Sequence, residues 1–173
     1  MFKTDLKIRI TIINDLEKEV LQEPNRVLRR KKLSELMSAR HNLRLQFYND
    51  SIQDATIQNM LSDEATTFIK FQEKLLTQFG CSNAEFGSCL SSIMNTCEQS
   101  ASIGNTTPIE ESKKSLYRLS ENIFHSSNIM KNYRLRGIKR CQILLDQYSL
   151  EQIKNTSRSL DCCTGLDKEE MSE

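Results

Sequence analysis

The chain of 173 residues contains few of the residues that build turns and strands. Glycine occurs 5 times, proline 2 times and tryptophan never, and the valines are Val20 and Val27 alone. Glycine and proline supply most tight turns, and β-branched residues such as valine favour strands. This composition argues against a strand-based fold and favours helices, because the remaining residues are mostly good helix formers.

Long apolar runs are also missing. The longest are only a few residues, whereas about 20 are needed to cross a bilayer as a helix. The first residues, Met1 to Asp5, are charged and lack the apolar core of a signal peptide. We therefore expect a soluble intracellular protein, in the cytoplasm or the nucleus, without a membrane span.

The net charge is close to zero. Lysine and arginine number 24 and the acidic residues 23, which gives a formal charge of +1. A balanced chain has no overall field that would attract nucleic acid or an anionic membrane. Any such binding must depend on local clusters.

The first segment has two competing periodicities. Residues 7–12 alternate as in a strand, while a longer set of apolar residues follows helical steps of three and four. That set consists of Leu6, Ile10, Ile13, Leu16 and Val20. We favour the helix, because a single strand would find no partner strand elsewhere in the chain. Pro24 predicts its end at Glu23.

A second apolar pattern begins after Asn25, whose side chain can cap a helix start. It returns at helical spacing up to Phe79, and Gly80 supplies a stop. The pattern weakens over residues 49–51, where a helix can bend or a new one begin. Without a break, one helix of roughly 80 Å would result, at about 1.5 Å per residue. The sequence leaves open whether this segment is one helix or two.

A shorter helix follows Gly80. Ser82 or Asn83 can cap it. It ends in the polar stretch Ser100–Thr107, which we expect to be a hinge between two halves of the chain. The apolar residues between these ends, at helical spacing, are Phe86, Leu90, Ile93, Met94 and Cys97.

The last long helix has a start signal at residues 107–110. Thr107 and Glu110 have the spacing of a capping box, and Pro108 stands where a missing N–H costs nothing. The apolar pattern that follows predicts a helix from Pro108 to about Lys154, with an interruption near Gly137.

Together these segments predict an all-α protein. We expect elongated helical hairpins or a helical bundle with long coiled-coil-like helices. The expected parts are residues 1–79, a helical hairpin with a long helix; residues 80–154, a short helix and a second long helix; and residues 155–173, a disordered acidic tail.

No catalytic or cofactor site is predicted. His41 and His125 are far apart in the sequence, and no phosphate-binding loop, metal-ligand spacing or carboxylate pair suited to acid–base chemistry is present. We expect the cysteines to be reduced, buried side chains without a metal or redox role. They are Cys81, Cys89, Cys97, Cys141, Cys162 and Cys163.

Two basic clusters are the strongest charge features. Residues 26–32 include five basic residues, at a helix start where cations oppose the helix dipole. The second cluster lies on the last long helix and consists of Lys131, Arg134, Arg136, Lys139 and Arg140. Either cluster is explained by a solvated helix surface or by binding to phosphates.

We predict a non-catalytic helical scaffold or adaptor, which pairs through its apolar stripes within a multiprotein complex or with a second copy. The positions expected to contact the partner are Leu61, Phe68, Leu75, Phe79, Leu119, Ile123, Met130 and Leu144. The alternative is a nucleic-acid-associated helical protein. Its anion-binding residues would be Arg29, Arg30, Lys31, Lys32, Arg136, Lys139 and Arg140.

Overall fold

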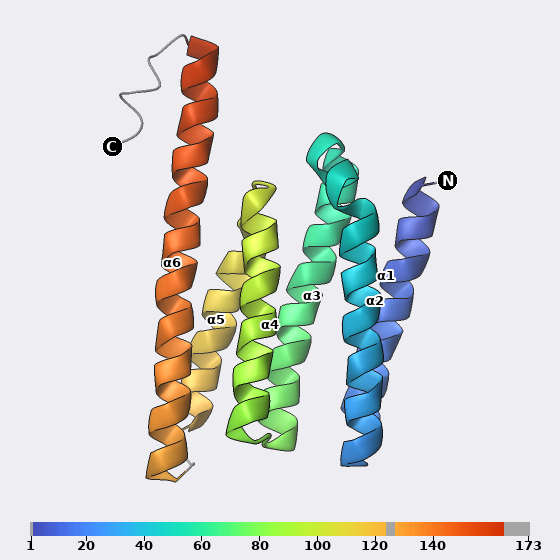
Figure 1. Ribbon diagram of the computed structural model, residues 1–173, viewed down its shortest axis with the longest axis vertical. Coiled ribbons are helices and arrows are strands. Elements are labelled where there is room, and N and C mark those ends of the chain that lie inside the picture. Colours follow the sequence, from blue (N-terminus) through green and yellow to red (C-terminus); the bar gives the residue numbers. More distant parts are fainter. Residues whose placement is uncertain (1, 124–126, 165–173) are drawn as a thin grey trace. The chain divides into compact units, whose positions relative to one another are not determined.

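A computed structural model shows a chain of α-helices (Figure 1). It describes the backbone of residues 2–123 and 127–164, and the side chains of residues 3–123 and 127–149. The helices are α1 (Phe2–Gln22), α2 (Arg26–Gln53), α3 (Ala55–Phe79), α4 (Asn83–Ser102), α5 (Thr107–Asn122) and α6 (Asn128–Thr164). No strand occurs in these described ranges, and the predicted all-α helical-bundle class is confirmed.

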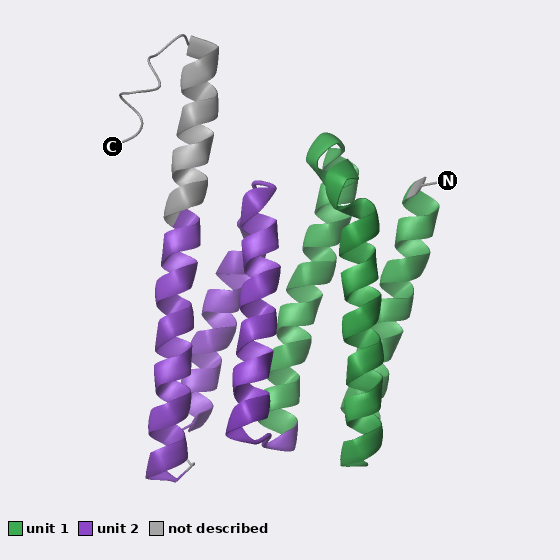
Figure 2. Ribbon diagram, in the orientation of Figure 1, with its two compact units in different colours: residues 1–78 green, residues 79–173 purple. Residues whose placement is uncertain are grey.

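The chain divides into two compact units (Figure 2). Unit 1 contains residues 1–78 with α1, α2 and most of α3, and unit 2 contains residues 79–173 with α4, α5 and α6. The division lies between Gln78 and Phe79, so the predicted hinge at Ser100–Thr107 is wrong. That stretch connects α4 to α5 inside unit 2, because both of these helices pack against α6.

Helix α1 confirms the helical interpretation of the first segment. Its fully buried residues Leu6, Ile13 and Val20 are spaced seven apart, which places them on one face of a helix. The helix ends at Gln22, just before Glu23-Pro24. Packing of this face against α2 explains why the helical period prevails over the alternating one.

The segment between Asn25 and Gly80 forms two helices. The Asn25 side chain caps α2 by accepting hydrogen bonds from the backbone N–H groups of Val27 and Leu28, at 2.9 and 3.1 Å. The break lies at Asp54, whose backbone is extended. Its carboxylate accepts a bond from the N–H of Thr56 at 2.8 Å and so begins α3. Gly80, with a φ of +52°, follows the end of α3 as predicted.

The predicted capping box at residues 107–110 is wrong. Thr107 is the first residue of α5, and the cap residue Thr106 makes no side-chain bond. The amide of Thr107 donates instead to the side-chain oxygen of Asn105 at 3.0 Å. Pro108 stands in the first turn as expected, because its missing N–H would have no partner there. The true capping box lies earlier, between Ser82 and Glu85 at the start of α4.

The last predicted helix is divided elsewhere than expected. Helix α5 ends at Asn122 and α6 begins at Asn128, whereas Gly137 lies inside α6 without interrupting it. A single glycine weakens a helix by only about 1 kcal/mol, which packing can offset. Helix α6 also continues past Lys154 to Thr164, so the disorder predicted for residues 155–173 is wrong over residues 155–164. The acidic residues 165–173 lie outside the described part of the chain.

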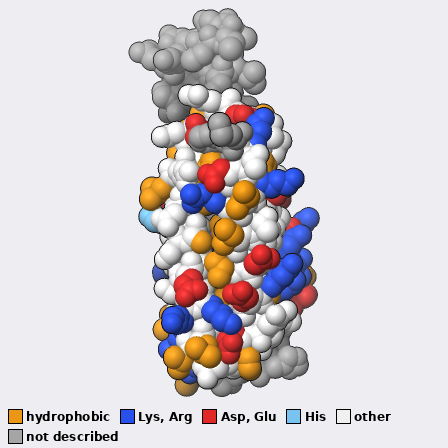
Figure 3. All heavy atoms as spheres, turned by 90° about the vertical axis from the view of Figure 1, so that its right-hand side faces the viewer, with side chains coloured by type: hydrophobic (Ala, Val, Ile, Leu, Met, Phe, Trp, Pro, Cys, Tyr) orange, Lys and Arg blue, Asp and Glu red, His pale blue; other side chains and the backbone are white. Residues whose placement is uncertain are grey.

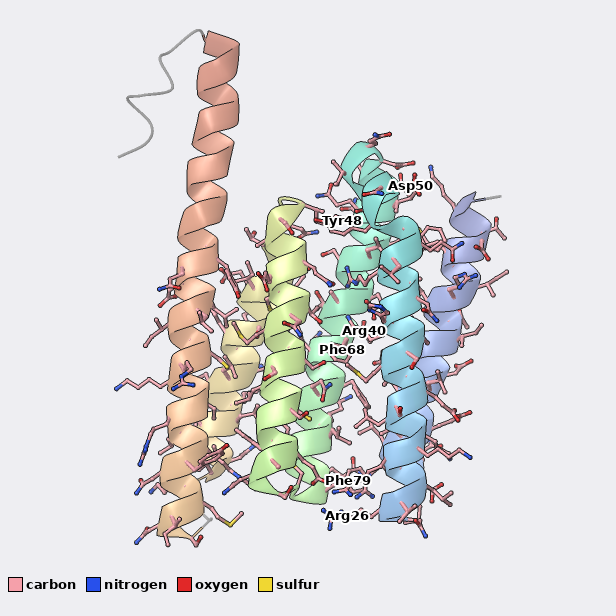
Figure 4. The ribbon with its side chains drawn as sticks, viewed as in Figure 1. Arg26, Arg40, Tyr48, Asp50, Phe68 and Phe79 are labelled. Atoms are coloured by element: carbon pink, nitrogen blue, oxygen red, sulfur yellow. The ribbon has the colours of Figure 1, made fainter. Side chains whose placement is uncertain are left out.

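The helices of unit 1 enclose a cluster of buried charges. Glu64 on α3 accepts bonds from Arg40 and Arg44 on α2, with Arg40 Nη2 at 3.1 Å and Arg44 Nη2 at 3.0 Å. All three residues are buried. Figure 4 labels Arg40 and Phe68, and the guanidinium of Arg40 lies 3.5 Å from the centre of the Phe68 ring. The carboxylate and the ring together compensate much of the desolvation of this arginine.

Glu17 of α1 lies in the same charged environment. Its side chain is buried, and its Oε1 atom has no hydrogen-bond partner among the described residues. Burial, followed by the nearby Glu64 carboxylate, raises the pKa of Glu17 from 4.5 to about 8, although Arg40 and Lys74 act in the opposite direction. Arg40 and Arg44 hold the pKa of Glu64 below its ordinary value despite its burial. The two carboxyl groups therefore have different protonation states at neutral pH.

We predict that Glu64→Ala destabilises unit 1 by about 3–5 kcal/mol, because two buried guanidinium groups lose their carboxylate. Asp63→Ala, at the neighbouring exposed position, is the matched control and should cost less than about 1 kcal/mol. Urea unfolding followed by circular dichroism measures both. Replacing Glu64, Arg40 and Arg44 together with Leu, Met and Leu should restore most of the loss. Equal, small effects of Glu64→Ala and Asp63→Ala would contradict the described ion cluster.

A second prediction concerns pH. Because the pKa of Glu17 is raised from 4.5 to about 8, the folded chain holds this proton more tightly than the unfolded chain. The resulting stability is complete below the unfolded value and is lost as the pH rises towards 8, and it amounts to at most about 5 kcal/mol. Glu17→Gln should remove this dependence and make the chain more stable than wild type in alkaline buffer. Urea unfolding from about pH 5 to about pH 9 tests this, and parallel curves for the two proteins would contradict it.

Candidate functional site

A groove lies between α4 and α6 in unit 2 and has a volume of about 540 Å³. These two helices pack directly against each other along this unit. From α4 the groove is lined by Phe86, Gly87, Leu90, Ser91, Met94 and Asn95. From α6 it is lined by Tyr133, Arg136, Gly137, Arg140, Cys141, Leu144 and Tyr148. Its interior is therefore mostly apolar, with polar and charged groups along its edges.

Arg134 fixes the start of α6 against the start of α4. It is buried, and it donates from Nε to the side-chain oxygen of Asn83 at 3.1 Å and from Nη2 to the carbonyl of Cys81. Its guanidinium also lies 5.1 Å from the centre of the Phe86 ring. Because residues near the beginning of both helices meet, α4 and α6 run parallel.

Small residues line the groove on both α4 and α6. A Cβ atom at Gly137 would stand 3.2 Å from Leu90 Cδ1, so a larger residue there would require the Leu90 side chain to shift by a few tenths of an ångström. On α4, Gly87, Ser91 and Asn95 are four residues apart and share one face. A Cβ atom at Gly87 would meet only the Tyr133 hydroxyl, at 3.9 Å. The α4 edge of the groove is thus low and uncharged.

The α6 edge carries the positive charge. Arg136 and Arg140 are exposed, and their spacing of four residues places them on the same face. No acidic residue is among the described residues that line the groove. Among the side chains that the structure describes, no carboxylate forms an ion pair with either arginine. The groove therefore combines an apolar interior with two cations on a single edge.

The predicted second basic cluster is only partly a surface feature. Arg134 is buried and structural, while Lys139 is exposed but does not line the groove. Arg136 and Arg140 are the members of this cluster that line it. Of the three anion-binding residues predicted in unit 2, Arg136 and Arg140 therefore line the groove and Lys139 does not.

The first basic cluster lies in unit 1, at the start of α2. Arg29 Nη1 donates to the backbone carbonyl of Glu23 at 3.1 Å, and Lys32 Nζ lies 3.0 Å from the Glu23 carboxylate. This bond from Lys32, with one from the backbone of Asn25, lowers the pKa of Glu23. Glu23 thus supplies the negative charge that a helix beginning with cations requires. Arg30 and Lys31 are exposed, and the structure places the two predicted clusters in different units.

Most residues predicted to contact a partner are buried within the chain. Leu61, Phe68, Leu75, Leu119 and Ile123 belong to its hydrophobic core, whereas Phe79, Met130 and Leu144 are half-buried. Of these eight, Leu144 lines the groove. The sequence signals that point to the groove are the small residues spaced four apart on α4 and the glycine inside α6.

The face of unit 1 formed by α1 and α2 also shows apolar side chains (Figure 3). Ile8 and Ile12, one turn apart on α1, are 55% and 51% exposed. Charged side chains of both signs surround the apolar ones in this view. Scattered apolar residues of this kind are usual on protein surfaces, and we assign no site to this face.

The described cysteines are poor nucleophiles. Cys89 and Cys97 are buried, and burial raises the pKa of each to about 12. The Cys97 thiol donates to the carbonyl of Pro108 at 3.8 Å, so it helps to join α4 to α5. Burial also raises the pKa of Cys81 and of Cys141. Thiols of this kind stay protonated near neutral pH.

Other chemical groups are distributed without a common centre. His41 is exposed on α2, while His125 and the side chains of Cys162 and Cys163 lie outside the described part of the chain. Within the described residues, no group of three or more His, Cys, Asp and Glu side chains has the arrangement to hold a metal ion. None of the helices in the described ranges combines the length and the apolar character needed to span a membrane.

Comparisons with known proteins give no relative for this chain: no protein-family model, curated protein or solved structure matches it.

We predict that Cys89 and Cys97 in the native chain react with iodoacetamide at least about 100-fold more slowly than the same residues in urea, because they are buried and protonated. Labelling near neutral pH followed by peptide mass spectrometry gives the rate at each position. The half-buried Cys81 provides an internal comparison and should react faster than Cys97. Rapid native labelling of Cys97 would indicate an activated thiol and contradict this description.

Proposed function

We propose that this chain is a non-catalytic helical adaptor, and that unit 2 binds a helix of a partner protein in the groove between α4 and α6. The observation that carries this proposal is the groove itself, with its mostly apolar lining and open edges. Many adaptors bind an amphipathic helix in a groove of this kind, where apolar side chains at helical spacing enter the floor.

The position of the groove on α4 supports this proposal. Cys97 faces α5, because its thiol bonds to Pro108. Asn95, at the edge of the groove, precedes Cys97 by two residues, which is about 200° around a helix at about 3.6 residues per turn. Leu90 precedes Cys97 by seven residues and lies on nearly the same face as Cys97. The outer edge of the groove on α4 is therefore turned away from α5, whereas its floor lies nearer to α5. A helix bound there would complete a four-helix bundle with α4, α5 and α6.

The chemistry of the described residues agrees with a binding role. Cys89 and Cys97 have pKa values raised to about 12 by burial, and neither is suited to nucleophilic attack. Glu17, whose pKa is raised to about 8, is buried in unit 1 and is not among the residues that line the groove. We therefore assign these groups to the packing of the chain.

Blocking the groove should abolish binding of a helix. Ser91→Trp places a large side chain in the groove, while Ser88→Trp adds the same group at an exposed position of α4 that does not line it. The probe is a displayed library of amphipathic 21-residue helices, with the flanking positions drawn from Glu, Lys, Gln and Ala, selected against the full chain. We expect the selected helices to bind Ser88→Trp as they bind wild type and to lose at least about tenfold in affinity for Ser91→Trp.

Circular dichroism and thermal unfolding of both variants provide the control for folding. If no helix is selected, or if the selected helices bind Ser91→Trp and wild type equally, the groove does not accept a helix and the proposal is wrong.

A further inference from the structure

We infer that the partner helix is acidic on one flank, so that its carboxylates meet Arg136 and Arg140 along the α6 edge of the groove. This inference rests on the proposed function, since it assigns a chemical class to the helix bound in the same groove.

The charges that line the groove favour an acidic partner. Arg136 and Arg140 are exposed on its α6 edge. Among the described side chains, none that lines the groove is acidic and none forms an ion pair with either arginine. Two arginines four residues apart match carboxylates at a similar spacing on a facing helix. The planar guanidinium group favours a carboxylate through paired hydrogen bonds. A cationic helix would be repelled at this edge.

The two edges differ, and this difference defines the partner more closely. The α4 edge presents Gly87, Ser91 and Asn95, which are small or neutral. A partner helix can approach this edge closely and needs no charge there. The expected partner therefore has an apolar stripe, acidic residues on one flank only, and small or neutral residues on the other.

The apolar stripe of the partner would meet the groove's interior. Leu90 and Met94 on α4 and Leu144 on α6 provide aliphatic contacts, and Tyr133, 53% exposed, stands at one end. Tyrosine and arginine are among the residue types that most often dominate binding energy in protein interfaces. Apolar residues at helical steps of three and four would follow this surface.

A second copy of the chain does not fit the same surface. In a two-fold dimer made by this face, each copy presents the same lining residues to the other. The described lining residues include no carboxylate, so the groove of a second copy offers no acidic partner for Arg136 and Arg140. A different protein with acidic residues on one flank complements these charges better.

The test uses the full chain and two synthetic 21-residue helices with the same apolar stripe. One helix has Glu at three positions of one flank, and the other has Lys at those positions. Fluorescence anisotropy of each labelled helix, titrated with protein in low and moderate salt, gives the affinities. We expect the Glu helix to bind at least about tenfold more tightly, with a preference that decreases as salt rises.

Single charge reversals test whether the α6 edge of the groove determines the preference for an acidic helix. Arg136→Glu and Arg140→Glu should each weaken the Glu helix by roughly fivefold and strengthen the Lys helix. Lys139→Glu is the matched control, because it is exposed on the same helix and changes the charge equally but does not line the groove. It should alter either affinity by less than about twofold.

The possible failures are distinguishable. If both helices bind equally and remain sensitive to Ser91→Trp, the acidic partner is wrong while the groove still accepts a helix. If neither helix binds, or if binding ignores Ser91→Trp, the proposed function fails as well. A DNA duplex is then added as a competitor. If it displaces the Glu helix from wild type but not from Arg136→Glu, the arginines bind phosphate groups, and the acidic helix is again the wrong partner.

Discussion

The close contact of α4 and α6 at Gly137 is the constraint on which the candidate site depends. A Cβ atom at this position would stand 3.2 Å from Leu90 Cδ1, so the glycine lets Leu90 pack tightly against α6. Arg134 fixes their relative register through Asn83, Cys81 and Phe86. With spacing and register determined, one face of each helix lines the groove, and Arg136 and Arg140 stand on a single edge.

The two units use polar residues in different ways. Unit 1 encloses Glu64 with Arg40 and Arg44, so its charges satisfy one another inside the core. Such a cluster specifies how the helices meet more than it adds stability, because desolvation offsets much of the attraction. In unit 2, Arg136 and Arg140 instead stand on the edge of an apolar groove, without an ion-pair partner among the described residues. This combination of an apolar groove and two cations on its edge is why we place the partner surface in unit 2.

Local chemistry explains which features the sequence predicts correctly. Caps and stops act within a few residues, so the roles of Asn25, Gly80 and Ser82 follow from their immediate neighbours in the chain. The identity of each packing partner is not local, because the apolar stripe of α3 has the same period whether it faces its own unit or another protein. From periodicity alone, Leu61 is predicted to contact a partner protein. In the folded chain its side chain is buried. The groove is not predictable in this way, because Gly137 and Leu90 meet only after folding.

The most direct test of the central claim is a map of backbone amide chemical shifts by NMR, recorded while the Glu-flanked helix is added to the full chain. Binding in the groove predicts changes concentrated along one face of α4, from Gly87 to Asn95, and along α6 from Tyr133 to Tyr148, with the amides of α1 and α2 unaffected. Changes centred on the exposed Ile8 and Ile12 of α1, or spread evenly over both units, would contradict a binding site between α4 and α6.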